Sequence, residues 1–166
     1  MKGLLIVDMQ EFYIGENRNS FFKYEAKKVI NSINKIISSY DKENVIYIVN
    51  FMKNNFINKF APFKLYEGDE EGRLVNDLLI VNNNIFKKHE GDAFTNKDLD
   101  IFLKSKGIDE VEIVGIDGGG CVSLTALGAI RSNYRVTINT EGVGTIFKNK
   151  EKKYYKKIAD LGGKII

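Results

Sequence analysis

The sequence predicts an α/β protein in which strands and helices alternate along the chain. Short apolar runs are separated by segments whose apolar residues recur every three or four positions. That order is typical of a sheet whose strands are joined by right-handed crossovers. The 166 residues, 43% of them hydrophobic, are enough for one domain with a sizeable core, and we expect residues 1–166 to form it.

The first quarter of the chain contains a buried strand and a long helix. Residues 3–7 form a continuous apolar run that ends at Asp8, which suits a strand covered on both faces. Residues 11–19 are typical of a loop. Apolar positions at helical spacing predict a helix over residues 20–40, with Ser20 as its N-cap.

A second strand and an aperiodic connection follow. Residues 44–50 are rich in Val, Ile and Tyr and predict the second strand. Residues 51–70 show no clear period, and a connection of this length is often a lid or a binding loop. We expect a short helix over residues 71–79 and a short third strand over residues 84–88.

Strands and helices also alternate in the second half of the chain. Thr95 opens a capping-box pattern and is the expected N-cap of a helix that ends at Gly107. An apolar run at residues 111–116 predicts the fourth strand, and glycines then lead into a helix that begins at Cys121. The remaining predicted elements are a strand at residues 134–139, a helix at residues 150–161 and a final strand at residues 163–166.

Cys121, the only cysteine, stands where a helix begins. A helix N-terminus has unpaired N–H groups and a partial positive charge, which favour the thiolate and lower the pKa of the thiol. Backbone N–H groups beside the sulfur could also hold an oxyanion. We interpret Cys121 as a nucleophile with a lowered pKa. The alternative is a small buried residue, the usual role of a lone cysteine in an apolar segment.

The glycines before Cys121 allow a second class of function. Gly118-Gly119-Gly120 approximates a dinucleotide-binding loop except at Ser123, and Glu141 stands where a ribose-binding acid is expected. The chain would then be a non-catalytic module that binds a nucleotide or another small molecule.

Two charged residues favour the enzyme. Asp8 ends the first strand, Lys88 ends or follows the third, and Cys121 follows the fourth, so all three can reach one edge of the sheet. A carboxylate near the thiol can act as a general base, and a lysine beside both favours their ionised forms. Taken singly, Asp8 could instead cap a turn and Lys88 could lie on the surface.

Three motifs resemble the isochorismatase-like cysteine hydrolases of the nicotinamidase/isochorismatase superfamily: Leu-Ile-Val-Asp-Met-Gln at residues 5–10, Lys-His-Glu-Gly-Asp-Ala-Phe at residues 88–94, and the cysteine segment at residues 115–129. The resemblance implies a three-layer fold around a six-stranded, mostly parallel sheet. It also implies an Asp8-Lys88-Cys121 triad that hydrolyses a small amide, carbamoyl compound or related metabolite through a covalent cysteine intermediate.

The resemblance also suggests supporting residues. It implies a cis peptide between Ile116 and Asp117, in an oxyanion loop that includes Gly120. The candidates for substrate binding are Gln10, Phe12, Asn50 and Phe94.

The chain departs from the family pattern in three places. Gly118-Gly119-Gly120 stands where bulkier residues are common. Asp92 stands where the family usually has serine. Nicotinamidases carry metal-binding histidines after the second strand, whereas residues 49–55 contain none and His89 is the only histidine. We therefore expect neither metal nor cofactor, disfavour nicotinamidase activity, and assign His89 to packing or to the surface.

Charge and hydropathy limit the partners. The net charge is +3 and the lysines are scattered, so we expect a small-molecule substrate and no nucleic acid. The densest basic run, residues 148–157, is interpreted as a solvated helix face. No apolar run approaches the roughly 18 residues of a membrane span, and no signal peptide is evident, which predicts a cytoplasmic protein. The family and the aromatic residues between positions 51 and 66 predict a homo-oligomer.

Overall fold

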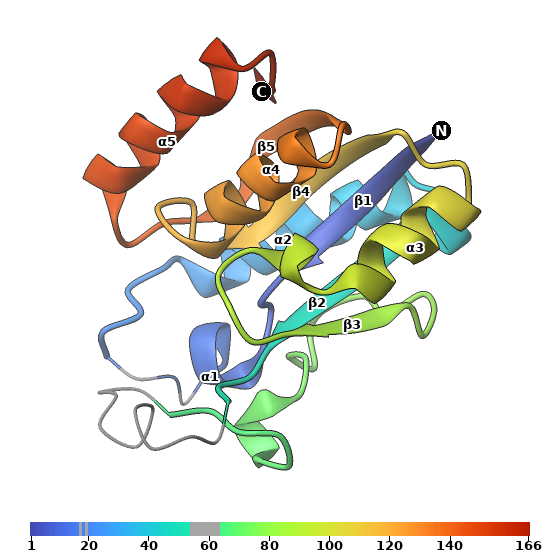
Figure 1. Ribbon diagram of the computed structural model, residues 1–166. Coiled ribbons are helices and arrows are strands. Elements are labelled where there is room, and N and C mark those ends of the chain that lie inside the picture. The colour runs from blue at the N-terminus through green and yellow to red at the C-terminus, as the bar shows by residue number, and fades with distance from the viewer. Residues whose placement is uncertain (17, 19, 54–63) are drawn as a thin grey trace.

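A computed structural model describes residues 1–16, 18, 20–53 and 64–166 of the chain, and its elements form a parallel sheet between two layers of helices (Figure 1). The strands run in the order β3-β2-β1-β4-β5-β6, and every neighbouring pair is parallel. The predicted six-stranded α/β architecture is thereby confirmed. The strands are β1 (Lys2–Val7), β2 (Val45–Asn50), β3 (Ile85–Lys88), β4 (Glu110–Ile116), β5 (Arg135–Gly144) and β6 (Lys164–Ile165).

The helices divide between the two faces of the sheet (Figure 1). One core contains the apolar residues of α3, α4 and α5, and the other contains those of α2. The helices are α1 (Glu11–Ile14), α2 (Ala26–Ser38), α3 (Lys97–Ser105), α4 (Cys121–Arg131) and α5 (Lys148–Asp160), with single 3-10 turns at Lys42–Asn44, Glu70–Gly72 and Ala93–Thr95.

The central strands show why continuous apolar runs appear in the sequence. Leu5 and Val7 face the core under α3 and α4, whereas Leu4 and Ile6 face α2, and all four are fully buried. Successive side chains of a strand point to opposite faces, so a strand covered on both sides needs apolar residues at every position.

The strand order reverses between β1 and β4. The chain leaves β1 toward β2 and β3, and it passes from β4 to β5 and β6 on the other side. In open α/β sheets such a reversal leaves a crevice at the carboxyl ends of the strands. Asp8 follows β1 and Cys121 follows β4 by a short loop, so both predicted site residues lie at this crevice.

The first loop and helix differ from the predictions. The helix α1 stands where residues 11–19 were expected to be a loop, and α2 begins at Ala26 rather than at Ser20. Glu25 is the N-cap, without a side-chain cap hydrogen bond. The reason lies in aromatic packing: the ring of Phe22 meets Tyr13 of α1 edge-to-face, with centroids 5.5 Å apart, instead of continuing the helix.

The segment before β3 is also less regular than expected. Only the 3-10 turn Glu70–Gly72 forms where residues 71–79 were predicted to be helical. The backbone of the next residues bonds to the chain after β1: Leu74 pairs with Gln10 in an isolated antiparallel bridge, and Val75 donates to the carbonyl of Met9. These bonds replace the helical ones.

Two boundaries shift farther along the chain. Asn96, not Thr95, caps α3, because its side chain accepts from the amide of Asp98 at 2.9 Å. Strand β5 continues to Gly144, beyond the predicted end at residue 139. Its register against β4 shifts between Ile113 and Gly115, so that Val143 and Gly144 pair with the last residues of β4. This extension brings the end of β5 beside the cysteine loop.

Half of the predicted lid or binding loop, positions 54–63, lies outside the described residues. At its flanks, Phe51 and Leu65 are buried with Val49 in a small third cluster. Among the described residues, none of the helices has both the length and the apolar composition that crossing a bilayer requires.

Candidate active site

Asp8, Lys88 and Cys121 are in direct contact at the carboxyl edge of the sheet. The Lys88 ammonium donates to Asp8 Oδ2 at 2.9 Å, to Cys121 Sγ at 3.2 Å and to the carbonyl of Glu90 at 3.1 Å. All three of its protons therefore have an acceptor. Lys88 and Asp8 are almost completely buried, at 1% and 2% exposure.

Burial dominates the electrostatics of these groups. It raises the pKa of the Asp8 carboxyl, and the neighbouring Lys88 opposes this shift without cancelling it. Burial alone would lower the pKa of Lys88, but the Asp8 carboxylate and the Cys121 sulfur raise it above its ordinary value. Asp8 is thus a stronger base than an exposed carboxylate, and Lys88 stays charged.

The predicted lowering of the thiol pKa is wrong for the resting protein. Burial, followed by the charge of Asp8, raises the pKa of Cys121 to about 12, although Lys88 acts in the opposite direction. The positive charge of Lys88 does not outweigh the transfer of the sulfur from water. Cys121 therefore rests as a thiol and needs a base. The second oxygen of Asp8, Oδ1, is buried without a hydrogen-bond partner among the described residues, so it can accept the proton.

The glycine loop between β4 and α4 uses its amides internally. Gly118 donates to the carbonyl of Gly144 at 3.1 Å, Gly119 to Asp117 Oδ1 at 2.9 Å and Gly120 to the carbonyl of Asp117 at 2.9 Å. A phosphate-binding loop must point such amides at its ligand. This arrangement speaks against the nucleotide-binding alternative. Gly120 lies in the expected oxyanion loop, but its amide already has an acceptor.

Two amides of the same loop are unoccupied. The structure has the cis peptide between Ile116 and Asp117. Within the described part of the chain, the backbone N–H groups of Asp117 and Cys121 have no hydrogen-bond acceptor. One belongs to the loop before α4 and the other to the first residue of α4, which is Cys121 itself, and free amides beside a nucleophile can hold an oxyanion formed on a substrate carbonyl.

A family model described as an isochorismatase domain matches residues 2–166. The chain belongs to the isochorismatase family. Membership makes this protein an isochorismatase-like hydrolase, in agreement with the resemblance of its three motifs. A search of curated proteins gives no match.

Solved structures share the fold of this family member. N-carbamoylsarcosine amidase from Thermoplasma acidophilum has a TM-score of 0.83 and 22% identity, over 99% of this chain and 94% of that one. Pyrazinamidase/nicotinamidase from Streptococcus mutans has a TM-score of 0.84 and 19% identity, over 100% of both chains. Pyrazinamidase of Pyrococcus horikoshii in complex with zinc has a TM-score of 0.83 and 22% identity, covering 99% of this chain and 98% of that one.

Gln10 of this isochorismatase-family protein does not offer a free group to a substrate. It is completely buried, and its amide bonds only to backbone. The nitrogen donates to the carbonyls of Asn50 and Gly72, and the oxygen accepts from the amide of Asn50 at 2.7 Å. Gln10 instead joins the ends of β1 and β2 to the turn at Glu70–Gly72.

Tyr13 and Tyr24 are residues of the site that the sequence analysis missed. Burial and then the charge of Asp8 raise the pKa of Tyr13, and its hydroxyl accepts from Asn50 Nδ2 at 3.0 Å. Burial and then the charges of Asp117 and Cys121 raise the pKa of Tyr24. Both phenols therefore lie within electrostatic reach of the thiol. Tyr13 stands five residues after Asp8, which was the available signal; Tyr24 stands before α2, where we expected a helix.

The other predicted substrate contacts have packing partners in the structure. Phe12 meets Tyr13 and Phe22 edge-to-face, and it borders the cluster of Phe51 and Leu65. Phe94 packs on Tyr134, with ring centroids 5.3 Å apart. Their roles in binding, and that of Asn50, stay predictions.

The family's serine position is occupied by a structural aspartate. Asp92 caps the turn Ala93–Thr95 through the amide of Phe94 at 2.8 Å, and it forms an ion pair with Arg131 of α4 at 2.7 Å. A side chain at Gly128 would collide with the carboxylate of Asp92, so this helix glycine leaves room for Asp92.

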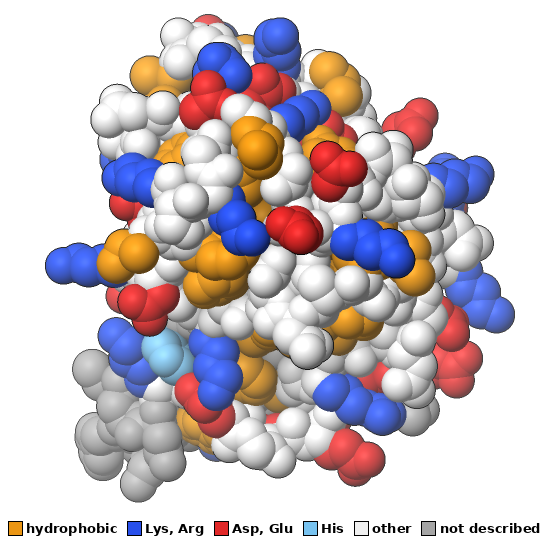
Figure 2. Space-filling model, turned by 90° about the vertical axis from the view of Figure 1, so that its right-hand side faces the viewer, with side chains coloured by type: hydrophobic (Ala, Val, Ile, Leu, Met, Phe, Trp, Pro, Cys, Tyr) orange, Lys and Arg blue, Asp and Glu red, His pale blue; other side chains and the backbone are white. Residues whose placement is uncertain are grey.

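The only histidine lies at the surface, as expected. His89 is exposed, and its Nδ1 lies 2.9 Å from the carbonyl of Phe51. In Figure 2 its pale blue side chain is visible on a face where basic and acidic side chains are interspersed. Within the described residues, no three His, Cys, Asp or Glu side chains are grouped as metal ligands.

Proposed function

We propose that this isochorismatase-family protein is a metal-free cysteine hydrolase, which cleaves a small amide, carbamoyl compound or related metabolite through a covalent intermediate on Cys121. The observation that carries the proposal is the buried Lys88, whose ammonium bonds both Asp8 and the Cys121 sulfur. A purely structural lysine would not require a thiol as partner, and a packing cysteine would not require a buried ion pair.

The first half of the reaction forms a thioester. Asp8 takes the proton of the thiol as the sulfur attacks the substrate carbonyl carbon, and the carbonyl electron pair moves to oxygen. The amides of Asp117 and Cys121 stabilise this oxyanion. When the carbonyl re-forms, the C–N bond breaks, and the proton on Asp8 passes to the departing nitrogen.

The second half releases the acid. Asp8, again ionised, takes a proton from water as the water oxygen attacks the thioester carbon. Collapse of the second oxyanion breaks the C–S bond, and the proton returns to sulfur. Lys88 keeps its charge throughout, because its three hydrogen bonds and raised pKa hold it protonated. Its charge compensates the negative charge that appears on sulfur.

The residues around the thiol favour a small substrate that combines polar and planar groups. The Tyr13 ring and the Asn50 amide form a hydrogen-bonded pair beside the Asp8 carboxylate. Aromatic rings pack on flat groups, and an amide can both donate and accept. Amides are also the substrates named for the similar structures, an N-carbamoylsarcosine amidase and two pyrazinamidases.

A hydrolysis screen tests the proposal. The purified protein is incubated with small amides, ureides, N-carbamoyl compounds and vinyl ethers, and product formation is followed together with the intact protein mass. We expect turnover of at least one class and a transient adduct on Cys121. Cys121→Ala should abolish both. A substrate hydrolysed equally well by this variant would overturn the proposal.

Cellular context and assembly belong to the same proposal. We expect a cytoplasmic homo-oligomer that acts on a small molecule and does not bind nucleic acid. Light scattering at micromolar concentration measures the assembly, and a monomer mass would contradict that part alone.

A further inference from the structure

The side chain of Asp117 fastens the cysteine loop to the segment after β5. Its Oδ1 accepts from the amide of Gly119 at 2.9 Å and from the amide of Ile146 at 3.2 Å. The first bond is within the loop, and the second crosses to the chain between β5 and α5. A single carboxylate oxygen therefore links the two segments that meet behind Cys121.

The backbone of the same residue orders the start of α4. The carbonyl of Asp117 accepts from Gly120 at 2.9 Å and from Val122 at 3.1 Å. These bonds set the position of the residue between them, Cys121, whose amide is one of the two candidate oxyanion donors. The other donor is the amide of Asp117 itself. Every bond that fixes Asp117 thus also fixes the spacing of the two donors.

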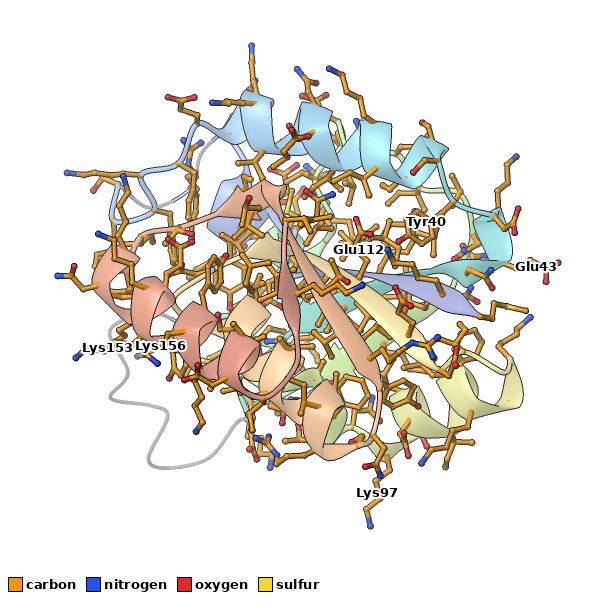
Figure 3. The ribbon with its side chains drawn as sticks, turned by 90° about the horizontal axis from the view of Figure 1, so that it is seen from above. Tyr40, Glu43, Lys97, Glu112, Lys153 and Lys156 are labelled. Carbon is orange, nitrogen blue, oxygen red and sulfur yellow. The ribbon has the colours of Figure 1, made fainter. Side chains whose placement is uncertain are left out.

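Helix α5 supports the loop from behind. Glu151 lies in its first turn and accepts from the Thr145 hydroxyl. A side chain at Gly118 would collide with both Glu151 and Thr145, which shows how closely the loop rests against them. Figure 3 shows α5 along this side of the molecule, with Lys153 and Lys156 directed outward.

Three consecutive glycines make such fastening necessary. Glycine has the widest backbone freedom of any residue. Without further bonds, Gly118-Gly119-Gly120 would allow the amides of Asp117 and Cys121 to change their relative positions. Stabilisation of an oxyanion depends on donors that are already in place before the reaction. The Asp117 carboxylate compensates for this freedom at Gly119, the middle glycine.

We propose that Asp117 is a positioning residue, whose carboxylate sets the oxyanion donors of the glycine loop while Glu151 of α5 supports the loop. The role rests on the proposed covalent function and adds a residue to it. Asp117 does not touch the substrate in this role: its Oδ1 is occupied by two amides, and its Oδ2 is buried.

An aldehyde probe tests the role without a known substrate. As the Cys121 sulfur adds to the carbonyl carbon of acetaldehyde or benzaldehyde, Asp8 takes the thiol proton and the carbonyl electrons move to oxygen. The oxyanion then takes up that proton, directly or through water, which completes a thiohemiacetal. Formation of this adduct passes through the oxyanion and protects the thiol from iodoacetamide. Alkylation itself displaces iodide from carbon and forms no oxyanion. The aldehyde concentration that halves the alkylation rate therefore measures how well the donors stabilise the oxyanion. The alkylation rate without aldehyde measures the reactivity of the thiol alone.

Three variants separate positioning from stability. Asp117→Ala should weaken aldehyde protection about tenfold or more, while alkylation without aldehyde changes less than about threefold. Asp117→Asn keeps an acceptor oxygen and should restore protection to within about threefold of the wild type. Asp92→Ala is the matched control, because Asp92 also caps a turn through the amide two residues on. It should lose stability but keep its protection.

A fourth variant tests the helix. Glu151→Ala should weaken protection in the same direction, whereas Asp160→Ala at the exposed end of α5 should not. If Asp117→Ala were protected as well as Asp92→Ala, the positioning role would be wrong although the covalent function could stand. If the wild type itself were not protected, the covalent function would be wrong and the positioning role with it.

Discussion

The charge of Asp8 affects Cys121 in opposite ways before and during the reaction. In the resting protein it disfavours the thiolate and so contributes to the raised pKa of Cys121. In the proposed mechanism the same carboxylate accepts the proton during attack. Reactivity toward an alkylating agent and turnover of a substrate should therefore respond differently to its removal.

Replacing Asp8 or Lys88 separates these effects. Asp8→Asn leaves Lys88 beside the thiol without a competing anion, so the thiol pKa should fall and alkylation near neutral pH should become faster. Turnover should fall about 100-fold or more, because the base is gone. Lys88→Met removes the cation that stabilises the thiolate, so alkylation should become slower.

Iodoacetamide rates measured across pH check both directions. If the wild type and Lys88→Met titrate alike, the lysine does not act on the sulfur. If Asp8→Asn reacts more slowly than the wild type at every pH, the sign that we assign to Asp8 is wrong.

Single residues show what a sequence can and cannot reveal about this site. Asp8, Lys88 and Cys121 could be placed together because each stands at a strand end, and parallel strands bring their ends to one edge. The direction of the thiol pKa could not be predicted, because the degree of burial is not visible in local sequence. Gln10 was misassigned for the same reason: its amide is used up by backbone groups distant in sequence.

At the scale of elements, the carboxylate of Asp92 lies so close to α4 that only glycine fits at position 128. Gly128→Ala should improve helix propensity by about 1 kcal/mol. Its Cβ would nevertheless collide with an Asp92 carboxylate that is held by Phe94 and Arg131. We expect a net loss of about 1–3 kcal/mol in the free energy of unfolding.

A double-mutant cycle with Asp92→Ser tests this pairing. The shorter serine leaves space for the new methyl group, so urea unfolding of the double variant should show a coupling of at least about 1 kcal/mol. Strictly additive losses would mean that Gly128 is required for another reason.

Strand β4 also contains a buried carboxylate, that of Glu112, which is not part of the candidate site. Glu112 accepts from Lys2 at 2.6 Å, from Tyr40 at 2.9 Å and from Asn139 at 2.9 Å, and Figure 3 shows Tyr40 and Glu112 side by side. Burial would raise its pKa, but the hydrogen bonds from Lys2, Asn139 and Tyr40 bring the pKa of Glu112 below its ordinary value.

This network should make stability depend on pH. Because the folded pKa lies below the unfolded one, Glu112 contributes stability above the unfolded value of about 4.3, and the contribution is lost as the pH falls through the folded pKa. Glu112→Gln should cost about 1–2 kcal/mol at neutral pH, a figure reduced because Lys2 is partly exposed.

Urea unfolding at neutral and acidic pH measures this dependence. The difference from the wild type should disappear in acid. Glu110→Gln on the same strand is the matched control, and its more exposed ion pairs should contribute less than about 0.5 kcal/mol. An effect of Glu112→Gln that persists unchanged in acid would contradict the assignment.

For the whole molecule, the sequence predicts the sheet and its strands better than the segments that connect them. Apolar runs such as residues 3–7 and 111–116 indicate buried strands whatever their partners. The start of α2 and the bridge at Leu74 depend on contacts with α1 and with the chain after β1, so no local pattern contains them.

The metal-ligating side chains of the sequence predict a protein without a metal cofactor. His89 is the only imidazole, and its Nδ1 faces a carbonyl oxygen. We expect purified protein to contain no stoichiometric zinc or iron, and chelators to leave activity unchanged. Elemental analysis that finds about one tightly bound transition metal per chain would contradict this expectation.

The central place of β1 has a consequence for synthesis on the ribosome. Strand β1 pairs with β2 on one side and with β4 on the other, and β4 begins only at Glu110. Until β4 has emerged, one edge of the apolar strand β1 has no partner strand. An unpaired edge of this kind promotes association with other chains. We therefore expect a long interval in which the nascent chain depends most on protection by chaperones, and Cys121 emerges only as that interval ends.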